Sequence, residues 1–205
     1  MSDFTYEAKD RKEVLETYEW DNVWIEQANN KAADRVLYIG DSISCGTRRV
    51  ATEMSGETVL FDGFGTSKAV DNPYLCESIA LFIRQLPGLQ VILFNNGLHG
   101  FHLSDDTAYA GDYEKIVRFL TESYPATPVY IVLTTDVDDT ERSERVKVRN
   151  GAAKAIAEKY ALPVIDLFRV SQEHKALLSA DGVHFTAEGY EKLAEEILKT
   201  LKNKD

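Results

Sequence analysis

The fold of this chain is indicated most clearly by the stretch Arg35-Val-Leu-Tyr-Ile-Gly-Asp-Ser-Ile-Ser-Cys-Gly-Thr-Arg-Arg49. Residues 36–39 form an apolar run with two β-branched members, and Gly40, Asp41 and Ser42 interrupt it abruptly. This pattern predicts a buried strand that ends in a tight turn, with Ser42 at its carboxyl end. Ligands of open α/β sheets bind at that edge, because loop groups and helix N-termini are exposed there together. Ser42 is therefore a candidate nucleophile, and it needs a base, an orienting acid and an oxyanion site.

Four more short apolar runs follow the first, and helical patterns separate them. The runs lie at residues 58–61, 91–94, 129–133 and 164–167. Apolar residues recur at 3.6-residue spacing between them and again in residues 187–202, after the last run. Five strands alternating with helices predict a parallel sheet covered on both faces, with right-handed crossovers. The loops that follow the strands should then gather at one edge of the sheet.

The length of 205 residues fits a single main domain, since one core can grow to about 250 residues before a chain divides. We expect residues 1–33 to form an N-terminal arm that packs on a main domain of residues 34–205. The apolar content of residues 11–30 favours helical or irregular packing in this arm. Its two tryptophans, Trp20 and Trp24, are expected to cover a sheet edge or a helix face.

Charge and composition narrow the function. The formal net charge of −11 disfavours nucleic acid and anionic membrane surfaces as partners and favours a neutral small-molecule substrate. No segment approaches the roughly 18–20 apolar residues of a membrane span. The two cysteines, Cys45 and Cys76, indicate neither a disulfide framework nor a zinc site. Residues 1–10 lack the apolar core of a signal peptide, so we expect a cytoplasmic protein, or a secreted or periplasmic one after removal of a leader.

A second informative stretch, residues 179–189, precedes the last predicted helix. Asp181 and His184 lie three positions apart in a loop tightened by Gly182. The carboxylate can therefore meet one imidazole nitrogen while the other nitrogen points away, as a serine nucleophile requires. Thr186 is the predicted N-cap of the helix, which would anchor the end of this loop. His184 follows Ser42 by 142 residues, so only the folded sheet can bring the two together.

These two blocks, Ile39-Gly-Asp-Ser42 and Asp181-Gly-Val-His-Phe185, resemble those of the SGNH hydrolases, the GDSL-type esterases and lipases. The resemblance covers about residues 34–202. It implies that Ser42 is the nucleophile, Asp181 the acid and His184 the base of a catalytic triad. It also implies a three-layer α/β/α sandwich of the flavodoxin-like type around a five-stranded parallel sheet, which agrees with the five predicted strands.

The same resemblance implies an oxyanion hole, and here the sequence departs from the family pattern. The backbone N–H of Ser42 and a glycine after the second strand would donate to the oxyanion; Gly65 is the candidate glycine and Gly63 the alternative. The family has an asparagine after the third strand, whereas this chain has Gly97-Leu-His-Gly100. His99 can donate from a ring nitrogen instead, or Asn95 or Asn96 can turn its amide into the site.

We therefore expect a serine esterase that removes a short acyl group, such as acetyl, without a metal or organic cofactor. Acetylated sugars are the substrates that the resemblance suggests first. One alternative is a lysophospholipase or thioesterase that uses the same residues. Another is a ligand-binding protein of the same fold, whose catalytic activity is weakened because the sequence after the third strand departs from the family pattern. A nucleotide-binding domain is disfavoured, because residues 40–46 lack the Gly-x-Gly-x-x-Gly pattern of a phosphate loop.

Overall fold

A six-stranded sheet in the order β1-β3-β2-β4-β5-β6 forms the centre of the computed structural model, which describes Leu15 and residues 18–202. The strands are β1 (Asp21–Trp24), β2 (Asp34–Gly40), β3 (Val59–Thr66), β4 (Val91–Phe94), β5 (Val129–Val132) and β6 (Val164–Ile165). Strands β2 to β6 pair in parallel, and β1 pairs with β3 in the antiparallel direction. The five predicted parallel strands are therefore confirmed, and a sixth strand is added at one edge.

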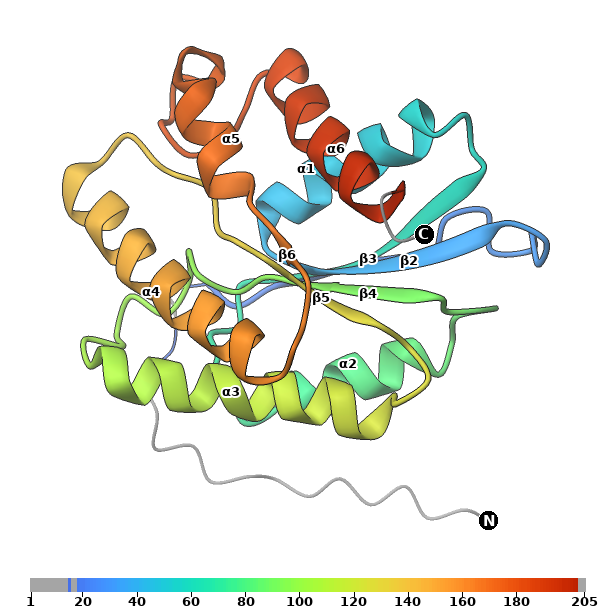
Figure 1. Ribbon diagram of the computed structural model, residues 1–205, viewed down its shortest axis with the longest axis horizontal. Coiled ribbons are helices and arrows are strands. Elements are labelled where there is room, and N and C mark those ends of the chain that lie inside the picture. Colours follow the sequence, from blue (N-terminus) through green and yellow to red (C-terminus); the bar gives the residue numbers. More distant parts are fainter. Residues whose placement is uncertain (1–14, 16–17, 203–205) are drawn as a thin grey trace.

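Helices cover both faces of this sheet (Figure 1). They are α1 (Ser42–Met54), α2 (Leu75–Ile83), α3 (Asp106–Ser123), α4 (Thr140–Lys159), α5 (Leu167–Glu173), a short 3₁₀ helix η1 (Lys175–Leu177) and α6 (Ala187–Lys202). Alternate residues of β2 point to opposite faces, so that Leu37 and Ile39 pack with α2 and α3, whereas Val36 and Tyr38 pack with α1 and α6. The three-layer α/β/α sandwich predicted from the sequence is thus the observed architecture.

The added strand β1 corrects the helical or irregular structure expected for this part of the arm. Its residues pair with β3 in a continuous register that sets Asn22 opposite Gly65 and Trp24 opposite Gly63. This pairing gives β3 a neighbour on its outer side, where its backbone groups would otherwise face solvent. Residues 1–14 and 16–17 of the expected arm lie outside the described residues, and the division of the chain after residue 33 stays a prediction.

Two aspartate side chains, Asp41 and Asp166, cap helices that begin directly after strands. The Asp41 carboxylate accepts a hydrogen bond from Ile43 N (2.9 Å), so α1 begins at Ser42, immediately after β2. The Asp166 carboxylate accepts from Arg169 N (2.9 Å) in the same way, which starts α5 at Leu167 and shortens the last strand to two residues. In both places the capping carboxylate stands directly after a strand, so strand and helix meet with almost no loop.

The order of the parallel strands places the topological switch point of the sheet between the ends of β2 and β4. The chain leaves β2 toward β3 on one side of the sheet and later returns to β4 on the other side. Loops that follow two such strands diverge, and ligands of doubly wound folds bind between them. Ser42 follows β2 and residues 95–100 follow β4, so both predicted parts of the site lie at this switch point. Among the described residues, no helix is both long and apolar enough to cross a membrane.

Candidate active site

Ser42, His184 and Asp181 form one hydrogen-bonded chain at the carboxyl edge of the sheet. The distance from His184 Nε2 to Ser42 Oγ is 2.8 Å, and His184 Nδ1 lies 2.6 Å from Asp181 Oδ2. An ionised carboxylate can only accept hydrogen bonds, so the ring proton belongs on Nδ1. Nε2 is then left as the acceptor for the Ser42 hydroxyl. The structure thus brings together the three residues that the sequence singled out.

The loop that carries His184 is held from three sides. Gly182 has a φ of 70°, which only glycine adopts without strain, and its carbonyl accepts from Asp138 N (2.8 Å). Ser179 N donates to the His184 carbonyl (2.7 Å), closing the loop across its base. The hydroxyl of Thr186 accepts from Gly189 N (3.3 Å), as expected for the N-cap of α6. The position of the His184 imidazole is therefore fixed by the hydrogen bonds of its loop as well as by those of its ring.

Asp181 accepts more hydrogen bonds than a surface carboxylate usually does. Its Oδ1 accepts from Val183 N and His184 N, both at 2.9 Å, and from the Ser179 hydroxyl, also at 2.9 Å. The hydrogen bond from the His184 ring and these backbone bonds hold the pKa of Asp181 well below its ordinary value. Asp181 therefore remains a carboxylate well into the acidic range.

Asp41, which precedes the serine, is buried and 3% exposed. Burial raises the pKa of Asp41, while its electrostatic interaction with His99 and its bond from Ile43 N act in the opposite direction. Of the effects that lower the pKa of Asp41, the one from the His99 ring is the largest. Trp20 packs edge-on against this ring, with 6.0 Å between the ring centroids.

The two asparagines proposed as oxyanion donors point elsewhere. Both amide hydrogens of Asn95 are used inside the fold, because Nδ2 donates to the Val132 carbonyl (2.8 Å) and to Thr134 Oγ1 (2.9 Å). Asn96 Nδ2 donates to the Lys68 carbonyl (2.8 Å). These bonds tie the loop after β4 to its neighbours. Among these three side chains, His99 is the one that interacts electrostatically with Asp41, the N-cap of α1.

The backbone of Gly65, the candidate oxyanion glycine, is paired with the added strand β1. Ser67 N donates to the Trp20 carbonyl (3.1 Å), and hydrogen-bonded pairs alternate along an antiparallel ladder. The Asn22–Gly65 pair lies two positions further along, so it is of the hydrogen-bonded kind and the Gly65 N–H faces β1. An added Cβ on Gly65 would lie 2.2 Å from Cys45 Sγ. This glycine therefore provides room for α1 while its N–H is used by the sheet.

Arg149 holds the loop that carries His99, and sequence reasoning missed it. Its buried guanidinium donates to the carbonyls of Gly97 (3.0 Å), His99 (2.5 Å) and Gly100 (2.8 Å). The signal for this role was a charge on the apolar face of a helix, because position 149 falls in line with Val146 and Ala153, which are both buried. No local motif accompanies this signal.

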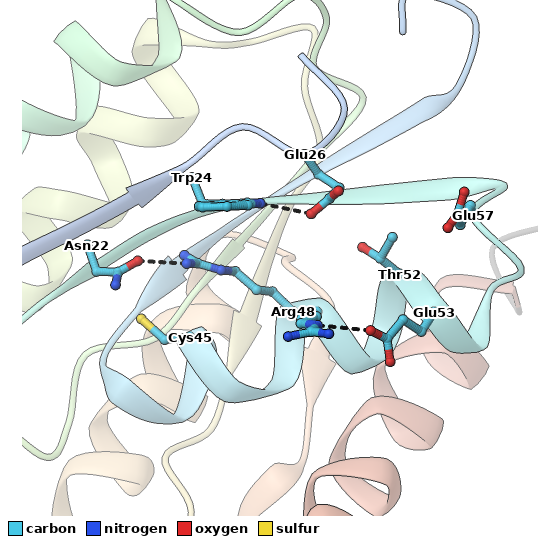
Figure 2. Close-up of a pocket in the computed structure, with 9 residues that line it drawn as sticks. Asn22, Trp24, Glu26, Cys45, Arg48, Thr52, Glu53 and Glu57 are labelled. Carbon is cyan, nitrogen blue, oxygen red and sulfur yellow. Dashed lines mark hydrogen bonds and ion pairs between the residues drawn. The ribbon is translucent and has the colours of Figure 1, made fainter. Parts of the chain in front are cut away.

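A cleft of about 520 Å³ lies between β1 and α1, and Figure 2 shows the side chains that line it. Trp24 and Asn22 come from β1, whereas Cys45 and Arg48 come from α1. Cys45 lies one helical turn after Ser42, and Asn22 is the strand partner of Gly65. The cleft therefore lies along α1, the helix that begins at Ser42, on the side of the added strand.

Comparisons with known proteins identify the family and the fold of this chain. A family model described as the GDSL-like lipase/acylhydrolase family matches residues 38–192. A lipolytic G-D-S-L family member from Veillonella parvula is 21% identical, with a TM-score of 0.67 over 83% of this chain and 99% of that chain. A search of curated protein sequences gave no match.

Two further structures share the fold. An acetyl xylan esterase is 16% identical, with a TM-score of 0.64 over 82% of this chain and 99% of its own. The catalytic domain of a peptidoglycan O-acetyltransferase from Streptococcus pneumoniae is 20% identical, with a TM-score of 0.64 over 83% of this chain and 94% of its own. These structures show the fold, and the family model shows the relationship. The chain belongs to the GDSL-like lipase/acylhydrolase family and is a hydrolase that acts on ester bonds.

Proposed function

We propose that this protein is a serine esterase that removes short acyl groups, acetyl above all, from carbohydrate through Ser42, His184 and Asp181. The observation that carries the proposal is the His184 ring, which is hydrogen-bonded to Asp181 through Nδ1 and to Ser42 through Nε2. This is the arrangement in which an imidazole can take a proton from a serine hydroxyl while a carboxylate stabilises the imidazolium.

The reaction proceeds by acyl transfer. Ser42 Oγ attacks the ester carbonyl as its proton passes to His184 Nε2, and the carbonyl oxygen becomes an oxyanion. Collapse of this intermediate breaks the bond to the alcohol, which leaves with the proton from His184. Water then gives its proton to His184 and attacks the acyl-enzyme, and the second collapse releases the acid and returns the proton to Ser42. Asp181 keeps the ring in the required tautomer throughout.

The oxyanion is held by the backbone N–H of Ser42 and by the His99 ring. Ser42 is the first residue of α1, where the helix leaves N–H groups unpaired and its dipole favours negative charge. His99 is favoured over Asn95, because the amide of Asn95 is bonded to Val132 and Thr134. One such donor typically lowers the barrier by about 3 kcal/mol.

Two observations support a short acyl group on a polar alcohol. The cleft beside α1 includes charged side chains such as Glu26 and Arg48, which suit a polar alcohol better than an apolar one. Structures of the same fold include an acetyl xylan esterase and a peptidoglycan O-acetyltransferase domain, both named for acetyl chemistry on polysaccharides.

Hydrolysis of p-nitrophenyl acetate tests the proposal. Replacing Ser42 with alanine is expected to lower kcat by about 10⁴-fold or more, since the remaining residues of a triad retain little activity. Ser55→Ala, at the other end of α1, is the matched control and should retain activity. Undiminished turnover by Ser42→Ala would refute the assignment. Activity that rises with acyl chain length would favour a lysophospholipase or thioesterase, and ligand binding without labelling by a fluorophosphonate would favour a binding protein.

A further inference from the structure

Two side chains that line the cleft between β1 and α1, Cys45 and Arg48, lie directly against glycines of β3. An added Cβ would lie 1.8 Å from Arg48 Nη1 on Gly63 and 2.2 Å from Cys45 Sγ on Gly65. Glycine at these alternate positions therefore lets the side chains of α1 lie directly against the strand. At about 520 Å³ the cleft falls within the range of about 300–1,000 Å³ typical of small-molecule sites.

Trp24 forms the opposite wall of this cleft. It is 55% exposed, although an indole gains more than most side chains from burial. Its orientation is fixed, because Nε1 donates to Glu26 Oε2 (2.8 Å). Figure 2 shows the Trp24 ring across the cleft from Cys45 and Arg48. The Trp24 indole therefore presents an exposed aromatic surface in the cleft beside α1.

Polar groups surround the indole in the same cleft. Arg48 is 7% exposed, and its Nη2 donates to Asn22 Oδ1 (2.6 Å), which orients the amide of that side chain. The lining includes two arginines, Arg48 and Arg49, against three glutamates, Glu26, Glu53 and Glu57. Arg49 is itself paired with Glu53 (2.9 Å). This excess of negative charge disfavours an anionic ligand. The carboxylate and amide groups of the lining can accept hydrogen bonds from hydroxyls.

We propose that this cleft is a subsite for a neutral saccharide, whose ring stacks on Trp24 while its hydroxyls bond to the surrounding polar side chains. One face of a pyranose ring carries C–H groups that pack on an indole, and its rim carries hydroxyls. The subsite deepens the proposed function and rests on it for its role, because it would hold the alcohol half of the ester beside Ser42. Asn22, Trp24 and Glu26 precede the residues that the family model matches, so the Trp24 side of the subsite lies outside the matched region and the α1 side lies within it.

Binding is tested without catalysis, by NMR of the wild-type protein. The chain has two tryptophans, so two indole N–H signals are expected, and Trp24→Phe assigns them. The probes are the β-1,4-linked trisaccharides of xylose, glucose and N-acetylglucosamine. At least one should shift the Trp24 signal more than the Trp20 signal. Trp24→Ala should weaken its binding by about tenfold, the loss expected when one aromatic contact is removed.

The kinetic arm compares an acetylated form of the trisaccharide that binds with p-nitrophenyl acetate, which has no sugar. Trp24→Ala should lower the ratio of kcat/KM for the sugar ester to kcat/KM for the simple ester by about tenfold. Tyr18→Ala, which removes an exposed aromatic side chain outside the cleft, is the matched control and should leave this ratio unchanged.

Three results would overturn the subsite: no trisaccharide shifts the Trp24 signal, Trp24→Ala binds as tightly as the wild type, or the kinetic ratio does not fall. A trigalacturonate that binds more tightly than the neutral trisaccharides would overturn the neutral assignment. These failures are separate from that of the proposed function, because ester hydrolysis retained by Ser42→Ala would refute the triad and leave the NMR result standing.

Discussion

Asp181 binds His184 twice, once through the backbone and once through the ring. Its Oδ1 accepts from His184 N at 2.9 Å, and its Oδ2 accepts from Nδ1 at 2.6 Å. One carboxylate thus fixes both the chain and the imidazole of the residue it orients. The spacing of three residues between them makes this double contact available within a single turn.

The first prediction concerns this double contact. Asp181→Asn keeps a side chain of the same size, but its amide can place a donor against Nδ1 and favour the wrong tautomer. We expect kcat for p-nitrophenyl acetate to fall by about 10⁴-fold, as for the equivalent change in other triads. Ser179→Ala removes only one hydrogen bond to Oδ1 and should cost far less. Similar kcat values for the two variants would contradict the role of Asp181.

The second prediction concerns the pH dependence contributed by Asp41. Because burial raises its pKa in the folded state, its contribution to stability is present below its unfolded pKa of about 3.9 and is lost as the pH rises through the folded value. Asp41→Asn keeps the helix cap without the charge. The variant should therefore gain stability relative to the wild type as the pH rises above about 4, as measured by urea unfolding. Asp41→Ala loses the cap, at a cost of about 1 kcal/mol, and is the control.

The third prediction separates His99 from Asn95. His99→Ala should lower kcat by about 10²–10³-fold with a smaller effect on KM, because the lost donor serves the transition state. His99→Asn, which restores the amide expected at this position, should recover part of the loss. Asn95→Ala should instead lower the free energy of unfolding by about 1–3 kcal/mol, since it leaves the Val132 carbonyl and Thr134 Oγ1 without their donor. The reverse assignment of the two effects would place Asn95 in the oxyanion hole.

The fourth prediction concerns Arg149. Arg149→Met keeps an apolar stem but leaves the carbonyls of residues 97, 99 and 100 without their donor, so we expect the free energy of unfolding to fall by about 3 kcal/mol or more. Arg145→Met, one turn earlier, is the matched control. Its guanidinium stacks 4.9 Å from the Phe101 ring centroid, a contact worth about 1 kcal/mol at an exposed site. Equal losses in urea unfolding would refute the special role of Arg149.

The sequence predicts those features whose signals are local. The apolar run before Gly40 and its four counterparts specify the parallel strands, because such runs need burial on both faces. The loop around Gly182 brings Asp181 and His184 together through bonds within six residues, from Ser179 to His184. The catalytic roles of these residues stay predictions until the variants are measured.

The remaining features depend on partners that are distant in the chain. Strand β1 is four exposed residues with no apolar alternation, and it is specified by its register against Gly63 and Gly65. That pairing also turns the Gly65 N–H away from the oxyanion position suggested by the resemblance. Arg149 acts on carbonyls about 50 residues away. No window of sequence contains both halves of either interaction.

The separation of Ser42 and His184 affects when activity can appear during protein synthesis. Ser42 begins α1, His184 precedes α6, and these two helices pack against each other, with the Tyr190 ring on Gly46. A ribosome must therefore add 142 residues after Ser42, the proposed nucleophile, before His184, its proposed base, exists. Under the proposed mechanism, nascent chains shorter than this carry an unactivated Ser42 hydroxyl, so the onset of esterase activity during translation would report that the segment carrying His184 has docked.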